Sequence, residues 1–149
     1  MQDLNFPGYE FRFKSSENTI HIFDPIRKKF VLLQPEEWVR QHVLQFLLQE
    51  KQYPKSHISV EKRLKVNDMI RRYDLVVFRP DGSIAVLVEC KAPGQQVSQA
   101  VFDQIARYNL QLRADFLMVT NGLNHYYCRM DFEGKRYEFL RELPAYAGP

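Results

Sequence analysis

Two acids and a lysine interrupt or end apolar stretches of this sequence, and their types could perform chemistry together. Glu89 and Lys91 close the apolar run that begins at Ile84, and Asp74 lies within an earlier apolar run. Side chains alternate along a strand, so Glu89 and Lys91 share one face and Cys90 lies opposite. Unpaired charge is costly to bury, so these residues need each other or a ligand. From this stretch alone, a structural ion pair at a strand end is an equally good interpretation.

The turn composition of Pro80–Ser83 separates the two apolar runs and predicts a β-hairpin. With a four-residue loop, Phe78 faces Ala85 and Asp74 faces Glu89. Opposed residues project from the same face of a sheet, so the two carboxylates are expected side by side. A one-residue slip or a bulge would change this pairing.

Two adjacent carboxylates repel each other, and both ionise readily only with a cation between them. Their hard oxygen ligands suit Mg²⁺ or Mn²⁺, a metal that activates bound water and neutralises phosphodiester charge. Lys91 could orient the attacking water or stabilise the developing charge. Asp74, Glu89 and Lys91 therefore fit metal-dependent phosphodiester hydrolysis. We expect Asp74→Ala to lose metal binding and, without metal, to raise stability by relieving the repulsion.

Composition places the chain among ordinary globular proteins. Its 149 residues suffice for one domain with a sizeable core, and 45% are hydrophobic and 26% charged. No apolar run approaches the ~20 residues of a membrane helix, and the N-terminus lacks an export signal. Cys90 and Cys128 form no zinc pattern or disulfide framework, so we expect free thiols in the cytoplasm. A net charge of +3 permits nucleic-acid binding without requiring it.

The elements that must position the three residues follow from periodicity and turn composition. They predict an α/β fold (α+β with a mixed sheet) in the order helix, three strands, helix, strand, with an N-terminal hairpin and C-terminal edge strands. A crossover helix makes the strands before and after it a parallel pair. The expected helices and strands are Pro35–Lys51, His57–Val66, Arg72–Phe78, 84–91, Ser98–Leu112, Phe116–Thr120, His125–Met130 and Tyr137–Leu140.

The domain organisation has three parts. Residues 1–29 are an extended arm or hairpin, residues 30–143 form the domain, and residues 144–149 are a tail. On the first helix, Glu36 and Arg40 are four residues apart and are expected to form a surface pair.

Asp74 followed by Glu89-Cys90-Lys91 resembles the PD-(D/E)XK nuclease motif. More narrowly, the sequence resembles the N-terminal nuclease domain of type I restriction enzyme R subunits from about Asp24 to Leu143. The motifs that carry this resemblance are Pro35-Glu36-Glu37-Trp38-Val39-Arg40-Gln41, Val88-Glu89-Cys90-Lys91-Ala92-Pro93, Phe102-Asp103-Gln104-Ile105-Ala106-Arg107-Tyr108-Asn109 and Val119-Thr120-Asn121-Gly122.

The resemblance implies a restriction-endonuclease-like core, Mg²⁺ (or Mn²⁺) dependence and a DNA substrate. It implies a metal site made by Asp74, Glu89 and the backbone carbonyl of Cys90, with Lys91 in catalysis. One departure from the motif is Tyr73, which stands where the motif has proline.

Two flanking motifs add site residues by the same resemblance. Gln104 and Tyr108 fall on the family's Gln-x-x-x-Tyr motif, although Tyr108 is also compatible with a core position. The helix glutamate best matches Glu36, and Glu37 is a rival. Basic residues near the strand ends are candidate DNA contacts together with Gln104, or are simply solvated: Arg63, Lys65, Arg71 and Arg72.

The sequence contains no Gly-rich phosphate loop ending in Gly-Lys-Ser/Thr, so it lacks the ATP-driven motor of an R subunit. The leading interpretation is a Mg²⁺-dependent deoxyribonuclease, either an isolated nuclease module or a fragment, with DNA as a partner and restriction-modification subunits as candidate partners. The alternative is a catalytically silent DNA-binding or assembly module with the same fold. The oligomeric state is open, a homodimer included.

Overall fold

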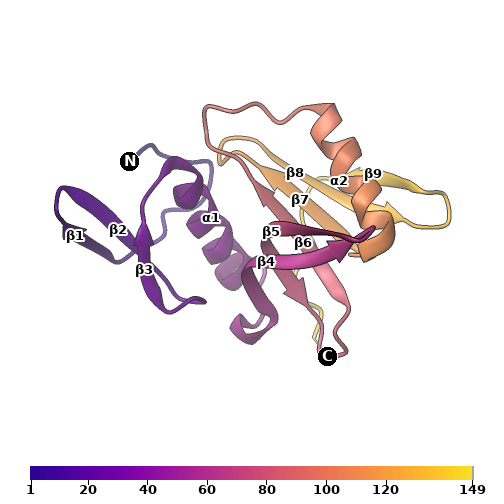
Figure 1. Cartoon of the computed structure of the whole chain (residues 1–149), viewed down its shortest axis with the longest axis horizontal. Coiled ribbons are helices and arrows are strands. Elements are labelled where there is room, and N and C mark those ends of the chain that lie inside the picture. Colours follow the sequence, from indigo (N-terminus) through magenta and orange to yellow (C-terminus); the bar gives the residue numbers. More distant parts are fainter. Residues whose placement is uncertain (149) are drawn as a thin grey trace.

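Helix α1 (Pro35–Gln45) lies between a small three-stranded sheet and a large six-stranded sheet (Figure 1). Helix α2 (Gln99–Leu112) covers the other face of the large sheet (Figure 1). This computed structural model describes residues 1–148. The arrangement confirms the expected mixed α/β fold, with one helix on each face of its main sheet.

The small sheet is antiparallel and has the order β1-β2-β3. Its strands are β1 (Phe13–Ser16), β2 (Thr19–Asp24) and β3 (Lys29–Leu32). The predicted N-terminal hairpin is confirmed in β1 and β2. The sequence did not predict strand β3, because it begins within the basic run Arg27-Lys28-Lys29 and its four residues are too few to show a clear alternation.

The large sheet has the order β4-β5-β6-β7-β8-β9. Strands β6 and β7 are parallel and joined through α2, as predicted, and the other neighbours are antiparallel. Its strands are β4 (Ile58–Val66), β5 (Met69–Phe78), β6 (Ile84–Cys90), β7 (Phe116–Thr120), β8 (His125–Asp131) and β9 (Arg136–Leu140).

The helices begin and end for local reasons. Pro35 opens α1, where its missing N–H has no partner to lose, and the helix continues as a π-helical turn at Phe46–Glu50. The Ser98 hydroxyl accepts a hydrogen bond from the Val101 N–H and caps α2. A short 3₁₀ turn at Lys55–His57 leads into β4. No helix within residues 1–148 is long and apolar enough to cross a membrane.

The two faces of β6 pack against different helices. Val86, Val88 and Cys90 join the apolar cluster that contains the buried side of α1, whereas Leu87 packs with Phe102 of α2. Cys90 therefore points into apolar packing on the α1 side, as the alternation predicted.

The β5–β6 hairpin follows the predicted register near the site but not near its loop. Val76 pairs with Leu87 as predicted, but the register shifts after Val77, so Phe78 pairs with Ile84 rather than Ala85. A bulge of this kind inserts one extra residue on one strand, and its position was not visible in the alternation.

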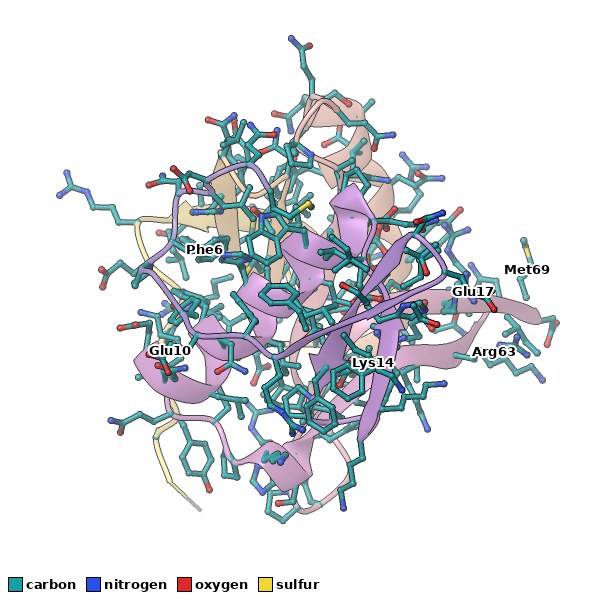
Figure 2. The ribbon with its side chains drawn as sticks, turned by 90° about the vertical axis from the view of Figure 1, so that its left-hand side faces the viewer. Phe6, Glu10, Lys14, Glu17, Arg63 and Met69 are labelled. Atoms are coloured by element: carbon teal, nitrogen blue, oxygen red, sulfur yellow. The ribbon has the colours of Figure 1, made fainter. Side chains whose placement is uncertain are left out.

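The N-terminal segment before β1 packs across α1 and reaches the turn between β7 and β8. Figure 2 shows this segment, marked by Phe6 and Glu10, crossing the viewer's side of α1. Asn5 donates its N–H to the Gly122 carbonyl at 2.8 Å. Gly122 has φ +87°, and an added Cβ would lie 2.9 Å from Leu4 and 3.0 Å from Val39. Glycine is therefore required both by backbone conformation and by close packing.

The C-terminal segment returns to the end of the first helical stretch. Tyr146 donates its N–H to the Lys51 carbonyl at 2.8 Å, and the Tyr53 hydroxyl donates to the Pro144 carbonyl at 3.1 Å. The predicted tail thus packs on the domain over the described part, and its last residue, Pro149, lies outside the described residues.

Asn109 fixes the end of α2 to the start of β7. Its amide donates to the Ala114 carbonyl and its carbonyl accepts from the Ala114 N–H, both at 2.8 Å. Both residues are fully buried, and Arg113 between them takes the left-handed conformation that ends the helix.

Asn109→Ala should lower the free energy of unfolding by about 2–4 kcal/mol, because it leaves two buried backbone groups without partners. Urea denaturation followed by circular dichroism measures the change. Arg107→Ala, on the exposed side of the same helix, serves as the control and should stay close to the parent. Equal stability of Asn109→Ala and the control would contradict this account of the α2–β7 junction.

Candidate active site

Glu89 and Lys91 meet at the carboxyl end of β6. The Lys91 ammonium lies 3.9 Å from the Glu89 carboxylate, and the Lys91 N–H donates to the Thr120 carbonyl at 2.8 Å. The strand end is therefore anchored to β7 just where the two charged side chains project. Both residues line a small cavity of about 100 Å³ with Arg71, Arg72, Tyr73, Val101, Gln104, Ile105 and Tyr108.

Helix α2 supplies the other wall of this cavity. Gln104 donates its amide to the Tyr108 hydroxyl at 3.3 Å, and the Arg71 guanidinium lies 4.1 Å from the centre of the Tyr108 ring. A guanidinium at that distance is attracted by the ring face. The structure thus brings Gln104 and Tyr108 to the same cavity as Glu89 and Lys91.

Asp74 is buried at the point where β5 and β6 separate. One carboxylate oxygen accepts the Cys90 N–H and the other accepts the Arg40 guanidinium, each at 2.8 Å. The regular ladder ends at Leu75 and Val88, so Asp74 does not form the simple facing pair with Glu89 that the register predicted. Asp74 reaches toward α1, whereas Glu89 lines the cavity beside α2.

The ion pair with Arg40 reverses the expected effect of removing Asp74. Without Asp74, the buried Arg40 guanidinium loses a close partner and the Cys90 N–H loses its acceptor. Uncompensated buried charge is strongly destabilising. Asp74→Ala should therefore destabilise the metal-free protein, contrary to the expectation from carboxylate repulsion alone.

Glu89 has a strongly perturbed carboxyl group. Burial, the Asp74 carboxylate and the Glu36 carboxylate raise the pKa of Glu89 to about 7, against the opposing effects of Lys91 and Arg71. Desolvation and like charges both favour the protonated form. Glu89 is therefore partly protonated at neutral pH.

The structure separates the two glutamates at the start of α1. Glu36 is half exposed, 3.8 Å from Arg40, and its pKa is raised by burial and by Asp74. Glu37 is buried and bonded to Arg27 and Arg40. The pKa of Glu36 thus responds to the charges of the site. Glu37 instead belongs to a buried ion network with Arg27 and Arg40.

Arg40 is the residue that sequence reasoning misplaced. It was expected in a surface pair with Glu36, but it is buried and bonds more closely to Glu37 and Asp74. The available signal was Val43 and Leu44, which lie three and four residues after Arg40 and therefore place it on the buried face of α1.

The basic residues proposed as DNA contacts divide between two places. Arg71 lines the cavity, whereas Arg63, Lys65 and Arg72 are exposed on the β4–β5 hairpin, and Arg72 also borders the cavity. Figure 2 shows Arg63 and Met69 on the projecting end of that hairpin. Arg63 and Arg72 are direct cross-strand partners, an arrangement of like charges that is unfavourable without an anion nearby.

The oxygen donors at this strand end fit a small divalent cation. Mg²⁺ in proteins is usually held by one or two carboxylates and retains several waters. Asp74 and Glu89 supply two carboxylates, and the pKa of Glu89 is raised first by burial and then by the Asp74 carboxylate. Among residues 1–148, no group of three histidine, cysteine or acidic side chains is arranged to hold a metal. A site here would therefore depend on backbone oxygen and water for its remaining ligands.

The protein is therefore a mixed α/β domain with one helix on each face of its main sheet. Two acids and a lysine gather at the β5–β6 hairpin of that sheet. The fold is similar to the structure of a fragment assigned as an HsdR subunit of a type I restriction enzyme from Vibrio vulnificus YJ016. That likeness has a TM-score of 0.52 and 20% identity, and covers 76% of this chain and 24% of that chain. The chain thus corresponds to about a quarter of the solved fragment.

Residues 35–144 match the family described as the type I restriction enzyme R protein N terminus (HSDR_N), and the chain belongs to this family. The resemblance in the sequence motifs is thereby confirmed. Among curated proteins, none matches this sequence.

The titration of Glu89 gives a pH-dependent prediction for the metal-free protein. The folded carboxyl keeps its proton up to a pKa of about 7, while the unfolded one releases it near 4.5. The folded state therefore binds more protons, and stability falls as pH rises between these values. Glu89→Gln should melt several degrees above the parent near pH 8 and equally near pH 4.

Thermal melting in EDTA across this pH range measures the effect. Glu10→Gln, which neutralises an exposed carboxylate in the N-terminal segment, is the control. A constant difference between Glu89→Gln and the parent at every pH would contradict the proposed titration.

Proposed function

We propose that this chain is a Mg²⁺-dependent nuclease module that hydrolyses phosphodiester bonds in DNA. The observation that carries the proposal is the convergence of Glu89, Lys91, Gln104 and Tyr108 on one cavity. Asp74 lies directly behind this cavity, bonded to the backbone of Cys90. Membership of the R-protein N-terminal family supports a restriction context.

Asp74, Glu89 and the Cys90 carbonyl would hold Mg²⁺ or Mn²⁺. The bound cation supplies Lewis acidity toward a phosphoryl oxygen and lowers the pKa of a coordinated water. A cation held here would favour the ionised form of Glu89, since its positive charge would offset the repulsion from Asp74. Metal affinity should therefore rise between pH 6 and pH 8.

Lys91 is the proposed catalytic cation. Its ammonium lies within 3.9 Å of Glu89 and retains partial exposure to the cavity. From there it can donate a hydrogen bond to the attacking water or to a phosphoryl oxygen as charge develops. Glu36, whose pKa is raised by burial and by Asp74, adds a third carboxylate to the surroundings of the site.

Gln104 and Tyr108 are proposed to orient a substrate phosphate at the cavity mouth. A neutral amide can bond a phosphoryl oxygen or a metal-bound water without changing the local charge. The Arg71 guanidinium over the Tyr108 ring fixes that wall and presents positive charge to a polyanion.

DNA contact is proposed for the exposed basic residues of the β4–β5 hairpin. The opposed Arg63 and Arg72 are unfavourable neighbours that a phosphate backbone would stabilise, and Lys65 follows on the same hairpin. The partners expected for such a module are DNA and the other subunits of a restriction-modification system.

A second candidate is a catalytically silent DNA-binding or assembly module. The observation in its favour is that both oxygens of Asp74 are bonded without any metal, one to the Arg40 guanidinium and the other to the Cys90 N–H. The two candidates differ in whether Mg²⁺ or Mn²⁺ binds and in whether DNA is cut.

The decisive experiment incubates the protein with linear, circular and single-stranded DNA in Mg²⁺, in Mn²⁺ and in EDTA. Metal-dependent cleavage supports the nuclease. Retained DNA binding without cleavage or metal binding would favour the silent module.

Lys91→Ala should reduce the cleavage rate by at least about 100-fold while leaving folding nearly unchanged, because the side chain acts in the reaction and not in the core. Cleavage rate, metal affinity by calorimetry and Tm are measured together. Lys135→Ala, at an exposed position on the β8–β9 hairpin, is the control. A Lys91→Ala variant that cuts as fast as the parent would rule out the proposed role.

Gln104→Ala should reduce cleavage by roughly 10-fold and change Tm little, because Gln104 is exposed and bonds only at the cavity wall. Tyr108→Phe should be milder, since the ring and its contact with Arg71 remain. A large loss of stability with unchanged cleavage would assign both residues to packing.

A further inference from the structure

Arg27 lies in the turn between β2 and β3 and joins three acids from different elements. Its guanidinium is 2.7 Å from Asp24, 2.8 Å from Glu37 and 3.3 Å from Glu61. Asp24 is fully buried, and it also accepts the backbone N–H groups of Ile26 and Arg27 at 2.8 Å. Asp24 therefore holds both the Arg27 side chain and the backbone of the β2–β3 turn in place.

The same ion network continues to the candidate metal site. One oxygen of Glu37 accepts both Arg27 at 2.8 Å and Arg40 at 2.7 Å. The second arm of the Arg40 guanidinium bonds Asp74 at 2.8 Å. Because Glu37 and Arg40 are both buried, solvent cannot replace these contacts easily.

The β4 strand is deformed where it passes this network. Glu61 has φ +53° and interrupts the β4–β5 ladder opposite Asp74. Its carboxylate lies 3.3 Å from Arg27 and 3.7 Å from Arg40. A non-glycine residue in this conformation is unfavourable alone, so the contacts to the two arginines compensate for it.

We propose that Arg27 is a positioning residue: acting through Glu37 and Arg40, it holds the Asp74 carboxylate in the orientation that a divalent cation requires. The family match begins at residue 35, so Asp24 and Arg27 lie in a segment outside it. The small N-terminal sheet thereby completes a site otherwise built by the family domain. The effect on metal binding rests on the proposed function. The structural coupling between Arg27 and Asp74 does not depend on it.

The sign of the effect on metal affinity distinguishes positioning from simple charge. Removing a positive charge near Asp74 should tighten cation binding if only the electrostatic potential changes. Releasing Glu37 from Arg27 lets Arg40 shift toward Glu37 and Glu61 and frees Asp74 to turn. Positioning therefore predicts weaker binding, although the net charge becomes more negative.

The test compares Arg27→Gln with Arg12→Gln, which removes an arginine of the N-terminal segment that stacks on Phe23 outside the network. The first measurement is the ¹⁵N–¹H signal and hydrogen-exchange rate of the Cys90 amide in the metal-free protein, since this N–H bonds Asp74 directly. The second is Mn²⁺ affinity by calorimetry well below Tm.

We expect Arg27→Gln to shift the Cys90 signal, to accelerate its exchange and to weaken Mn²⁺ binding by roughly 3- to 10-fold. This is less than the roughly 10- to 100-fold effect of residues that bond a metal ligand directly, because Arg27 acts through two intervening side chains. Arg27→Lys should give intermediate values, and serves as the test if Arg27→Gln does not fold. Arg12→Gln should match the parent.

An unchanged Cys90 amide in a folded variant would overturn the coupling, and unchanged or tighter Mn²⁺ binding would overturn the positioning role. If the parent itself binds no Mn²⁺, the proposed function fails, and the Cys90 amide alone then decides whether Arg27 controls Asp74.

Discussion

Burial of the Asp74 carboxylate is the constraint on which the rest of this structure depends. A buried acid must be hydrogen-bonded and paired with positive charge, and here the Cys90 N–H and Arg40 provide both. Arg40 in turn requires Glu37, and Glu37 is shared with Arg27. One buried acid of β5 is thus linked through ion pairs to α1 and to the turn after β2.

The site combines rigid and accessible parts. The buried Arg40 guanidinium holds Asp74 in place. Glu89 and Lys91 instead face a cavity and retain partial exposure. The α2 wall contributes neutral and aromatic groups, with Gln104 and Tyr108 one helical turn apart. A preorganised acid beside adjustable neighbours suits the binding of a small cation whose remaining ligands are water.

Much of this could be predicted from sequence because the signals were local. The parallel β6–β7 pair, the α2 cap at Ser98 and the register at Val76 all follow from periodicity and turn chemistry. The ion pair between Arg40 and Asp74 could not be predicted, because the two residues are distant in the chain and meet only in the folded protein. The bulge after Val77 likewise depends on packing and leaves no mark in the alternation.

The N-terminal segment has a consequence for how independent the family domain is. Trp38 donates its indole N–H to the Gln2 carbonyl at 2.7 Å, and His125 lies 2.6 Å from the Asn5 carbonyl. Leu4 closes over the Gly122 backbone. A chain beginning at residue 35 would expose these groups along one side of α1. The N-terminal segment is therefore packed into the domain that the family match outlines, and domain transplantation would need to carry this segment with it.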